Sequence, residues 1–356
     1  MEELSTRLIV SIAGAVIGAI FGFIVERTNF CTMGAVSDAV AMNDFRRARA
    51  WALAIAVAIL GAQGLQLAGF VDLQKSIYLG SSLGWLGGII GGLMFGFGMT
   101  LSGGCASRNL VRFGAGDVRS LIVVVVLGIF AYITMRGLIA PSRMMLEGAT
   151  NIDLGATAFK SQGIPELLAG AFGGSLAAIR AAATLVVALA ILWFCFKDAD
   201  FRDSPTHIVS GVGIGLVIIA GWWVTGVLGF DEFEPTRPSS LTYTAPVGNT
   251  LVYLMTYSGA SIEFGIASVV GAIAGAYLSA ILRKSFSLAG FADRSDLFRN
   301  LGGAALMGTG GVMALGCTVG QGLTGISTLS LGSLIALASI VAGGVLGIKY
   351  LERQMV

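Results

Sequence analysis

The sequence predicts an all-α polytopic membrane protein. Of the 356 residues, 55% are hydrophobic and only 12% are charged, whereas about 25% of the residues in an ordinary soluble domain are charged. The apolar residues recur in runs of roughly 17 to 25, the length that crosses the hydrocarbon of a bilayer as an α-helix. These runs are continuous and do not alternate with polar residues, which excludes a closed β-barrel.

About nine apolar runs have this length. We expect transmembrane helices over residues 8–26, 51–71, 84–101, 119–138, 180–196, 207–228, 262–282, 300–316 and 332–350, with their ends placed to within about 2 to 4 residues. An odd number of crossings puts the two termini on opposite sides of the membrane.

Glycines recur at every fourth position within several of these runs. The series are Gly14, Gly18 and Gly22; Gly88, Gly92 and Gly96; Gly271 and Gly275; and Gly343 and Gly347. Small residues at this spacing let helix backbones approach closely in lipid. We interpret them as helix-packing residues and assign them no chemistry.

Basic residues fall unequally on the two sides. With the N-terminus outside, the inner segments hold 14 lysines and arginines and the outer segments hold 7, with Arg27 unassigned. The positive-inside rule therefore favours a periplasmic N-terminus and a cytoplasmic C-terminus in a bacterial inner membrane. The residues before the first run include no basic n-region and no small-residue cleavage site, so we expect no removable signal peptide.

An internal repeat appears when the chain is slid along itself until Gly104-Cys105 coincides with Gly316-Cys317. The same displacement, called the repeat shift below, also superposes several glycines that precede them. Five crossings separate the copies, so they point in opposite directions, as in the inverted repeats of secondary transporters. We predict a first repeat over 1–140, a linker with a connecting helix over 141–205 and a second repeat over 206–356. Chance matches among many glycines are the alternative.

Three of the four cysteines directly precede segments that can begin a short helix: "TMGAVSDAV" after Cys31, "ASRNLV" after Cys105 and "TVGQGLTG" after Cys317. Irregular backbone at membrane depth persists only where it is buried in protein or lines a cavity. The free N–H groups of a helix start favour an anion. We therefore expect short re-entrant helices whose starts face a small anion.

The choice of cysteine at these positions indicates a soft ligand. A thiol is a weak, polarisable donor, poorly suited to hard oxygen anions and better suited to an anion whose charge sits on sulfur or selenium. The fourth cysteine, Cys195, stands among aromatic residues and is expected to pack as a small hydrophobe. A disulfide or a metal site among the other three is the alternative, although no C-x-x-C occurs and the single histidine, His207, begins a different run.

Polar residues beside the cysteines form a second group of candidates. Glu26 and Arg27 could pair with each other, or Arg27 could attract the anion. Arg108, with Arg112 and Arg119, fits an anchor at the inner interface better than a ligand contact. Gln321 aligns with Asn109 across the repeat and could donate to the ligand or cap a helix. The supporting residues of the predicted site are Arg27, Asn29, Gly104, Arg108, Gly316, Thr318 and Gln321.

Three motifs in order carry a family resemblance. "RTNFC" at 27–31, "GGCA" at 103–106 and "GCTVGQGL" at 316–323 resemble the cysteine motifs of the YeeE/YedE family of sulfur-compound transporters, whose best understood members take up thiosulfate. With "SLTYTAPVG" at 240–248, the resemblance covers most of the chain. It implies an hourglass-shaped inverted-repeat fold in which Cys31, Cys105 and Cys317 pass thiosulfate along through S–H contacts to sulfur. Ser107-Arg108 and Cys195 depart from the family pattern.

The sequence therefore predicts uptake of thiosulfate or a similar reduced sulfur anion, with the lipid bilayer and that anion as partners. No nucleotide-binding motif occurs and the loops are too short for a catalytic domain, so we expect no enzyme activity, no cofactor and no nucleic-acid partner. One alternative is transport of a selenium compound by the same fold. Another is a membrane thiol sensor or sulfur-relay subunit, which would need a soluble partner such as a cytoplasmic sulfur-carrier protein.

Overall fold

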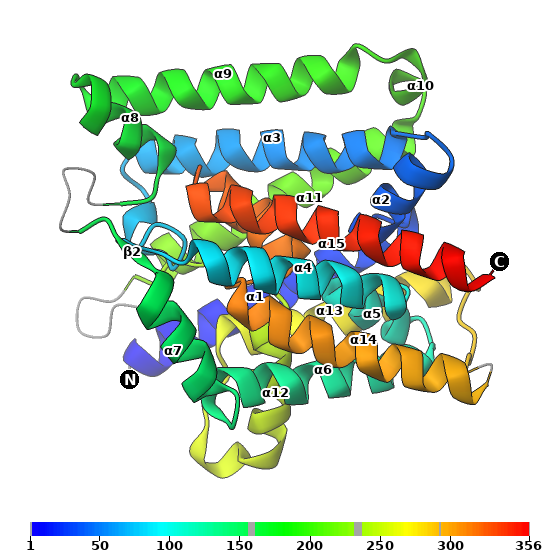
Figure 1. Cartoon of the computed structure of the whole chain (residues 1–356). Coiled ribbons are helices and arrows are strands. Elements are labelled where there is room, and N and C mark those ends of the chain that lie inside the picture. Colours follow the sequence, from blue (N-terminus) through cyan, green and yellow to red (C-terminus); the bar gives the residue numbers. More distant parts are fainter. Residues whose placement is uncertain (1, 156–160, 231–236, 292, 356) are drawn as a thin grey trace.

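The computed structural model describes residues 2–155, 161–230, 237–291 and 293–355. Almost all of the regular structure in these ranges is helical, as predicted, and the only strands described are two that hold two residues each (Figure 1). The elements are α1 Glu2–Thr28, α2 Thr32–Ala41, α3 Arg46–Leu67, η1 Leu73–Lys75, β1 Ser82–Leu83, α4 Trp85–Leu101, α5 Ala106–Gly114, α6 Val118–Arg136, α7 Ala140–Thr150, β2 Ile152–Asp153, α8 Ile164–Phe172, α9 Leu176–Phe196, α10 Ala199–Arg202, α11 Pro205–Trp223, η2 Val224–Leu228, α12 Thr244–Met255, η3 Tyr257–Gly259, α13 Phe264–Leu282, α14 Arg294–Met313, η4 Gly320–Gly325 and α15 Leu331–Met355.

Eight helical segments of the described chain are long and apolar enough to cross a bilayer, and they match eight of the nine predicted runs. The ninth prediction, 300–316, falls on α14, whose first turns carry Arg294, Asp296 and Arg299 and are therefore less apolar. Helix α14 nevertheless lies alongside α4 in the bundle, and the two termini lie at opposite ends of the helix array (Figure 1). Opposite termini are what nine crossings require.

Helix α3 begins at Arg46, before the predicted start at 51. The apolar run does begin near Trp51, but the preceding turn is helical and rich in arginine. Long basic side chains can keep their charged ends in the interface while their stems cover apolar surface. A helix can therefore extend beyond its apolar run, which is the reason for the difference.

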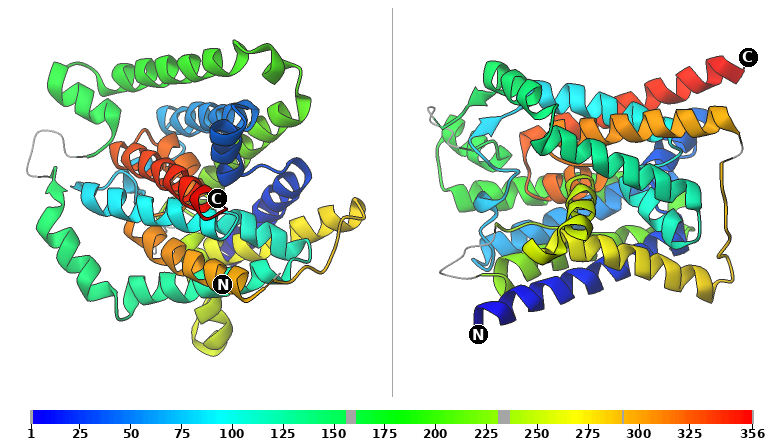
Figure 2. Two further views of the ribbon diagram at one scale, coloured as in Figure 1. Left: turned by 45° about the vertical axis from the view of Figure 1, so that its right-hand side comes forward. Right: turned by 90° about the horizontal axis from the view of Figure 1, so that it is seen from below.

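The glycine series do mediate close helix packing. A Cβ atom built on Gly18 would lie 2.2 Å from Ser268 O, and one on Gly22 would lie 2.0 Å from Ala272 O. Helices α1 and α13 therefore pack with their backbones almost in contact and run in the same direction, side by side in the view from below (Figure 2). Any larger side chain at Gly18 or Gly22 would push these helices apart.

The contacts of α4 and α14 are reciprocal. A Cβ on Gly98 would lie 2.6 Å from Gly303 O, and a Cβ on Gly310 would lie 2.5 Å from Gly91 O. The two helices are therefore antiparallel, since a later residue of one meets an earlier residue of the other. The repeat shift converts one of these contacts into the other, because it moves Gly98 onto Gly310 and Gly91 onto Gly303.

The neighbours of these two helices follow the same pattern. Gly96 of α4 approaches Ile340 O of α15 at 2.0 Å, and Gly308 of α14 approaches Leu127 O of α6 at 2.4 Å, both measured from an added Cβ. The repeat shift moves Gly96 onto Gly308, and it moves Leu127 onto the residue just before Ile340. Helix α4 therefore meets α15 as α14 meets α6.

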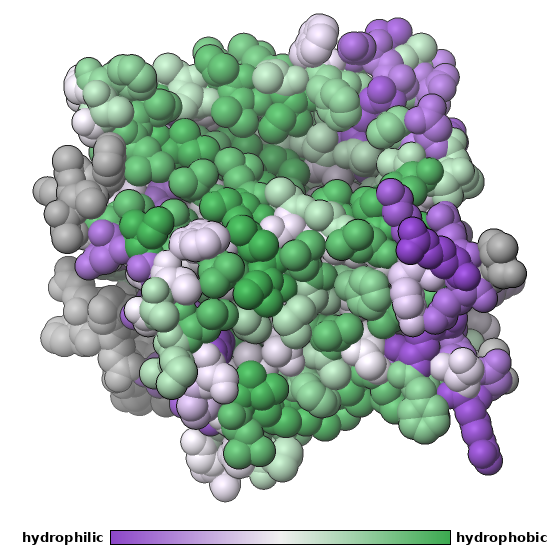
Figure 3. Space-filling model, in the orientation of Figure 1, coloured by the Kyte–Doolittle hydropathy of each residue, from purple (hydrophilic) through white to green (hydrophobic). Residues whose placement is uncertain are grey.

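The segment between the two motif-bearing halves lies at the edge of the bundle. Helix α9 packs on α3, leaves most of its surface exposed, and runs along the edge of the molecule in Figure 1 and in the left view of Figure 2. An ion pair between Glu166 and Arg180 joins α8 to α9. The face in Figure 3 is largely hydrophobic, and hydrophilic residues gather at the end where α15 terminates.

Candidate functional site

Cys31 lies in a short break between α1 and α2. The chain leaves α1 through Asn29, whose φ of +54° is in the left-handed region that asparagine tolerates better than most residues. Cys31 then takes an extended conformation as the N-cap of α2, and its Sγ accepts a hydrogen bond from Gly34 N–H at 3.4 Å. The side chain is buried. The predicted helix start after Cys31 is therefore present.

Cys105 lies in a similar break between α4 and α5. Gly103 turns the chain with a φ of +62°, and the fully buried Cys105 is the N-cap of α5. Its Sγ lies 3.3 Å from the Ser107 hydroxyl. Asn109 closes the loop by donating from Nδ2 to Gly104 O at 2.8 Å and to Cys105 O at 3.1 Å.

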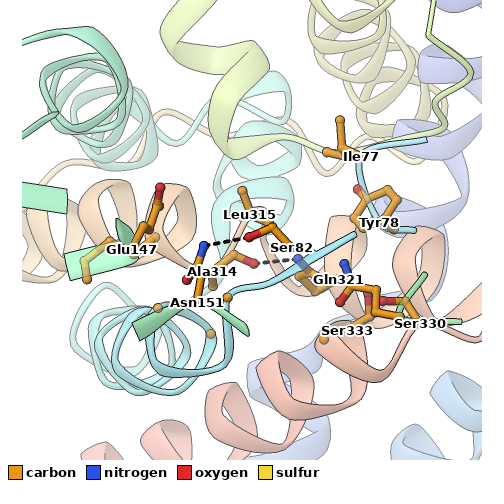
Figure 4. A pocket seen from close by; sticks show the side chains of 16 residues that line it. Ile77, Tyr78, Ser82, Glu147, Asn151, Ala314, Leu315, Gln321, Ser330 and Ser333 are labelled. Carbon is orange, nitrogen blue, oxygen red and sulfur yellow. Dashed lines mark hydrogen bonds between the residues drawn. The ribbon is translucent and has the colours of Figure 1, made fainter. Parts of the chain in front are cut away.

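Cys317 follows α14 in a third break, where Leu315 has a φ of +57°. Its Sγ accepts from Gly320 N–H at 3.4 Å, the same i to i+3 bond that Cys31 makes. Gln321 donates from Nε2 to Ala314 O at 2.5 Å, and this bond is drawn in Figure 4. Gln321 and Asn109 therefore both close a cysteine loop by donating to a backbone carbonyl. Gln321 Oε1 has no hydrogen-bond partner among the described residues.

The three breaks meet inside the protein. The Cys31 and Cys105 thiols are close enough to interact with each other, and Cys105 also interacts electrostatically with Cys317. All four cysteines are free. Cys195 lies elsewhere, buried on α9, with its thiol 3.3 Å from Arg49 O. The packing role predicted for Cys195 agrees with this position.

Arg108 links two of the cysteine loops. Its Nη2 donates to Asn29 Oδ1 at 2.7 Å and its Nη1 to Val25 O at 3.2 Å, so one guanidinium joins α5 to the chain just before Cys31. An added Cβ on Gly104 would lie 3.1 Å from Arg108 Cγ, which makes this loop tight. Gly316 is in the equivalent position, 3.2 Å from Gln321 Cγ.

The suggested ion pair between Glu26 and Arg27 is wrong. Glu26 is buried and instead faces Arg283 at 3.6 Å, with hydrogen bonds from Ser279 and Ser285. Successive residues of a helix point in different directions, so Glu26 turns toward α13 while Arg27 is exposed. Within the described chain, Arg27 forms no hydrogen bond or ion pair with any of the cysteines.

Arg112 and Arg119 make local contacts away from the thiols. Arg112 donates to Gly103 O at 2.9 Å. Arg119 lies 3.4 Å from Asp117 and 3.7 Å from Asp296. These bonds position the loops around α5 and α14, which is consistent with anchoring and provides no ligand contact.

Tyr243 is a site residue that the sequence reasoning missed. It is completely buried, forms the N-cap of α12, and packs its ring 5.1 Å from that of Phe21. Its backbone N–H lies close to the Cys317 thiol. The sequence does contain a signal for it, because the repeat shift that superposes Cys105 on Cys317 also superposes Cys31 on Tyr243.

A cavity of about 160 Å³ lies at the end of the bundle where α4 begins, and Ala314, Leu315 and Gln321, which flank Cys317 in the chain, line it (Figure 4). Tyr78 lines it and is an electrostatic neighbour of Cys317. Polar atoms without a hydrogen-bond partner in the described chain also line this cavity: Asn151 Oδ1, Gln321 Oε1, Ser330 Oγ and Ser333 Oγ. Glu147 also lines the cavity, and its carboxylate is paired with Arg143 at 2.7 Å. The neutral donors and acceptors that make up the rest of the polar wall suit a small polar solute.

A bundle of crossing helices, with short helices that begin at membrane depth around buried residues, defines a membrane transporter or channel. The chain matches the sulphur transport family over residues 27–346 and belongs to that family. It is 28% identical to the thiosulfate transporter TsuA of Escherichia coli strain K12, over 88% of this chain and 86% of that protein. It is 26% identical to the thiosulfate transporter TsuA of Spirochaeta thermophila, over 89% of this chain and 91% of that protein.

Proposed function

We propose that this protein takes up thiosulfate or a closely similar reduced sulfur anion through a pathway formed by the thiols of Cys31, Cys105 and Cys317. The observation that carries the proposal is the convergence of three free, buried thiols, each at the start of a short helix. The names of the two relatives support the substrate.

The local hydrogen bonds support a donor role for the thiols. In Cys31 and Cys317 the sulfur already accepts a backbone N–H, so its S–H hydrogen is left to donate. A soft donor suits the terminal sulfur of thiosulfate better than it suits the oxygens of sulfate. The supporting residues act indirectly in this proposal: Arg108, Asn29, Gln321, Gly104 and Gly316 hold the loops, and Thr318 begins the helix after Cys317.

The pathway would run from Cys317 to Cys105 and then to Cys31. Cys317 neighbours the residues of the cavity, and Cys31 lies beside the inner arginines Arg47 and Arg108. Arg27 is exposed at the end of α1 and would contribute only positive charge. An anion leaving Cys31 would therefore emerge among positive charges on the inner side.

We also propose that residues 1–140 and 206–356 form two inverted repeats, joined by 141–205. The antiparallel arrangement of α4 and α14 supports this, as do the reciprocal contacts of these helices. A two-fold axis in the membrane plane would pass between Gly98–Gly303 and Gly91–Gly310, close to Cys105 and Cys317. A shared site near the repeat interface is the usual location in such proteins.

For topology we propose a periplasmic N-terminus and a cytoplasmic C-terminus in the inner membrane. The excess of lysines and arginines in the segments on the C-terminal side, 14 against 7, supports this orientation. A phosphatase active only in the periplasm should be inactive when fused to the C-terminus and active when fused to the N-terminus. The reverse result would overturn the proposed orientation.

Uptake in cells that lack other sulfate and thiosulfate importers tests the function. We expect the protein to restore growth on thiosulfate as the sole sulfur source but not on sulfate, and purified protein in liposomes to admit labelled thiosulfate. A selenium transporter would instead prefer the selenium analogue in competition, and a thiol sensor would give no flux. Growth that persists in cells without cytoplasmic sulfur-carrier proteins would remove such a partner from the proposal.

A further inference from the structure

A phenol stands where the repeat would place a fourth thiol. Cys105 and Cys317 are equivalent under the repeat shift, and Cys31 is equivalent to Tyr243. Cys31 directly precedes the short helix α2, and Tyr243 directly precedes the short helix α12. Cys31 lies beside Cys105, whereas Tyr243 lies beside Cys317. The two ends of the thiol cluster therefore differ in chemistry.

Three hydroxyl groups without partners lie at the Cys317 end, whereas at the Cys31 end of the described chain Thr32 Oγ1 is in the same condition. Tyr243 Oη, Thr244 Oγ1 and Thr318 Oγ1 belong to residues that are at most 1% exposed, and these atoms form no hydrogen bond of normal geometry in the described chain. Thr318 lies next to the Cys105 thiol. An added Cβ on Gly311, near the end of α14, would lie 2.7 Å from Thr244 Oγ1. Buried polar groups in proteins are nearly always hydrogen-bonded, so these three require an explanation.

Their position in the helices explains why they remain available. Buried threonines within helices usually donate to a carbonyl one turn back, as Thr134 does to Phe130 O at 2.7 Å and Thr250 to Pro246 O at 2.7 Å. Thr244 and Thr318 stand at the first position of their helices. No helical carbonyl lies one turn before them. Their hydroxyls are therefore free to donate to a ligand.

We propose that Tyr243, Thr244 and Thr318 bind the oxygen atoms of the transported anion while the Cys105 and Cys317 thiols contact its terminal sulfur. The inference rests on the proposed function and assigns the oxygen-recognising half of the site. Hydroxyls are harder and stronger donors than thiols, so the two groups recognise the two ends of a mixed sulfur and oxygen anion. The anion would travel with its sulfur toward Cys31 and its oxygens toward the cavity.

Kinetics of purified protein in liposomes with labelled thiosulfate test the assignment. Tyr243→Phe removes one hydroxyl and keeps the ring that packs on Phe21. We expect its KM for thiosulfate to rise about five- to tenfold, the effect of losing one hydrogen bond, while the maximal rate stays within about twofold. Thr244→Val and Thr318→Val should act in the same direction.

Two control variants separate recognition from folding. Thr134→Val removes a buried hydroxyl that is already bonded within its helix, and Tyr350→Phe removes a phenol that accepts from Gln354 at the surface. Both should keep the wild-type KM, although Thr134→Val can lower the melting temperature. If the wild-type protein transports thiosulfate and Tyr243→Phe, Thr244→Val and Thr318→Val all keep the wild-type KM, the role of these hydroxyls is wrong and the proposed function still stands. Absence of thiosulfate transport by the wild-type protein would instead overturn the proposed function.

Discussion

Replacing Cys31, Cys105 or Cys317 singly by serine is expected to abolish most thiosulfate uptake, by at least about tenfold, while membrane abundance stays near wild type. Serine keeps the hydrogen-bonding hydrogen and is slightly smaller, so Gly34 N–H and Gly320 N–H still have an acceptor in Cys31→Ser and Cys317→Ser. It loses the polarisable sulfur that matches the soft end of the anion. Uptake of labelled thiosulfate, normalised to protein in the membrane, measures the effect.

Cys195→Ser is the matched control. Its thiol lies 3.3 Å from Arg49 O, a contact that a serine hydroxyl can also make, and it is remote from the three motif cysteines. We expect uptake within about twofold of wild type for a single buried substitution that keeps its hydrogen bond. Full activity of all three motif variants would refute the thiol pathway and leave only the helix starts as an anion site.

The pattern of losses also distinguishes a relay from covalent chemistry. In a relay each cysteine is needed independently, so each single variant fails. In a disulfide mechanism the adjacent pair Cys31 and Cys105 would behave as one unit, because these two thiols lie within reach of each other, and Cys317→Ser would be tolerated. Wild-type uptake by Cys31→Ser alone would remove that residue from the pathway.

The helices and the three cysteine loops can be predicted from local sequence because their causes are local. An apolar run determines a membrane helix, and a break marked by glycine or asparagine before Cys31 and Cys105 determines where a new helix begins. Helix α14 is predicted to exist because an apolar run follows its charged first turns, but its start at Arg294 is predicted too late. The start of α3 is predicted too late because its arginine-rich turn has no apolar pattern.

The partners of individual side chains cannot be predicted in the same way. Glu26 pairs with Arg283 and accepts hydrogen bonds from Ser279 and Ser285, which lie far along the chain, and it does not pair with its sequence neighbour Arg27. Tyr243 escapes prediction for a different reason. The repeat is recognised in the sequence by matching cysteines and glycines. Tyr243 occupies the position equivalent to Cys31, before a short helix, but a tyrosine does not match a cysteine and is therefore overlooked.

Arg108→Leu is expected to lower thiosulfate uptake at least about tenfold. The Arg108 guanidinium is a clamp that holds Asn29 Oδ1 and Val25 O through two different nitrogens, and it thereby fixes the Cys31 loop against the helix that begins after Cys105. Hydrogen bonds from charged groups contribute about 1.5–3 kcal/mol each. Loss of the clamp would let Cys31 and Cys105 separate and interrupt the pathway between them.

Conservative variants make this expectation specific. Arg108→Lys keeps the charge but cannot reach both acceptors with a planar fork, so it should retain an intermediate rate. Asn29→Gly keeps the left-handed backbone and removes the amide, so it should resemble Arg108→Leu.

Arg46→Leu provides the charge control for Arg108→Leu. It removes one positive charge from the same side, but the Arg46 guanidinium is bonded locally to Asp44, where it lowers the pKa of that carboxyl to about 2. This variant should transport at the wild-type rate. An equal loss in Arg46→Leu and Arg108→Leu would mean that general positive charge, and not the clamp, supports uptake. Wild-type uptake by both Arg108→Leu and Asn29→Gly would show that the Cys31 and Cys105 loops keep their positions without the hydrogen bonds of Arg108.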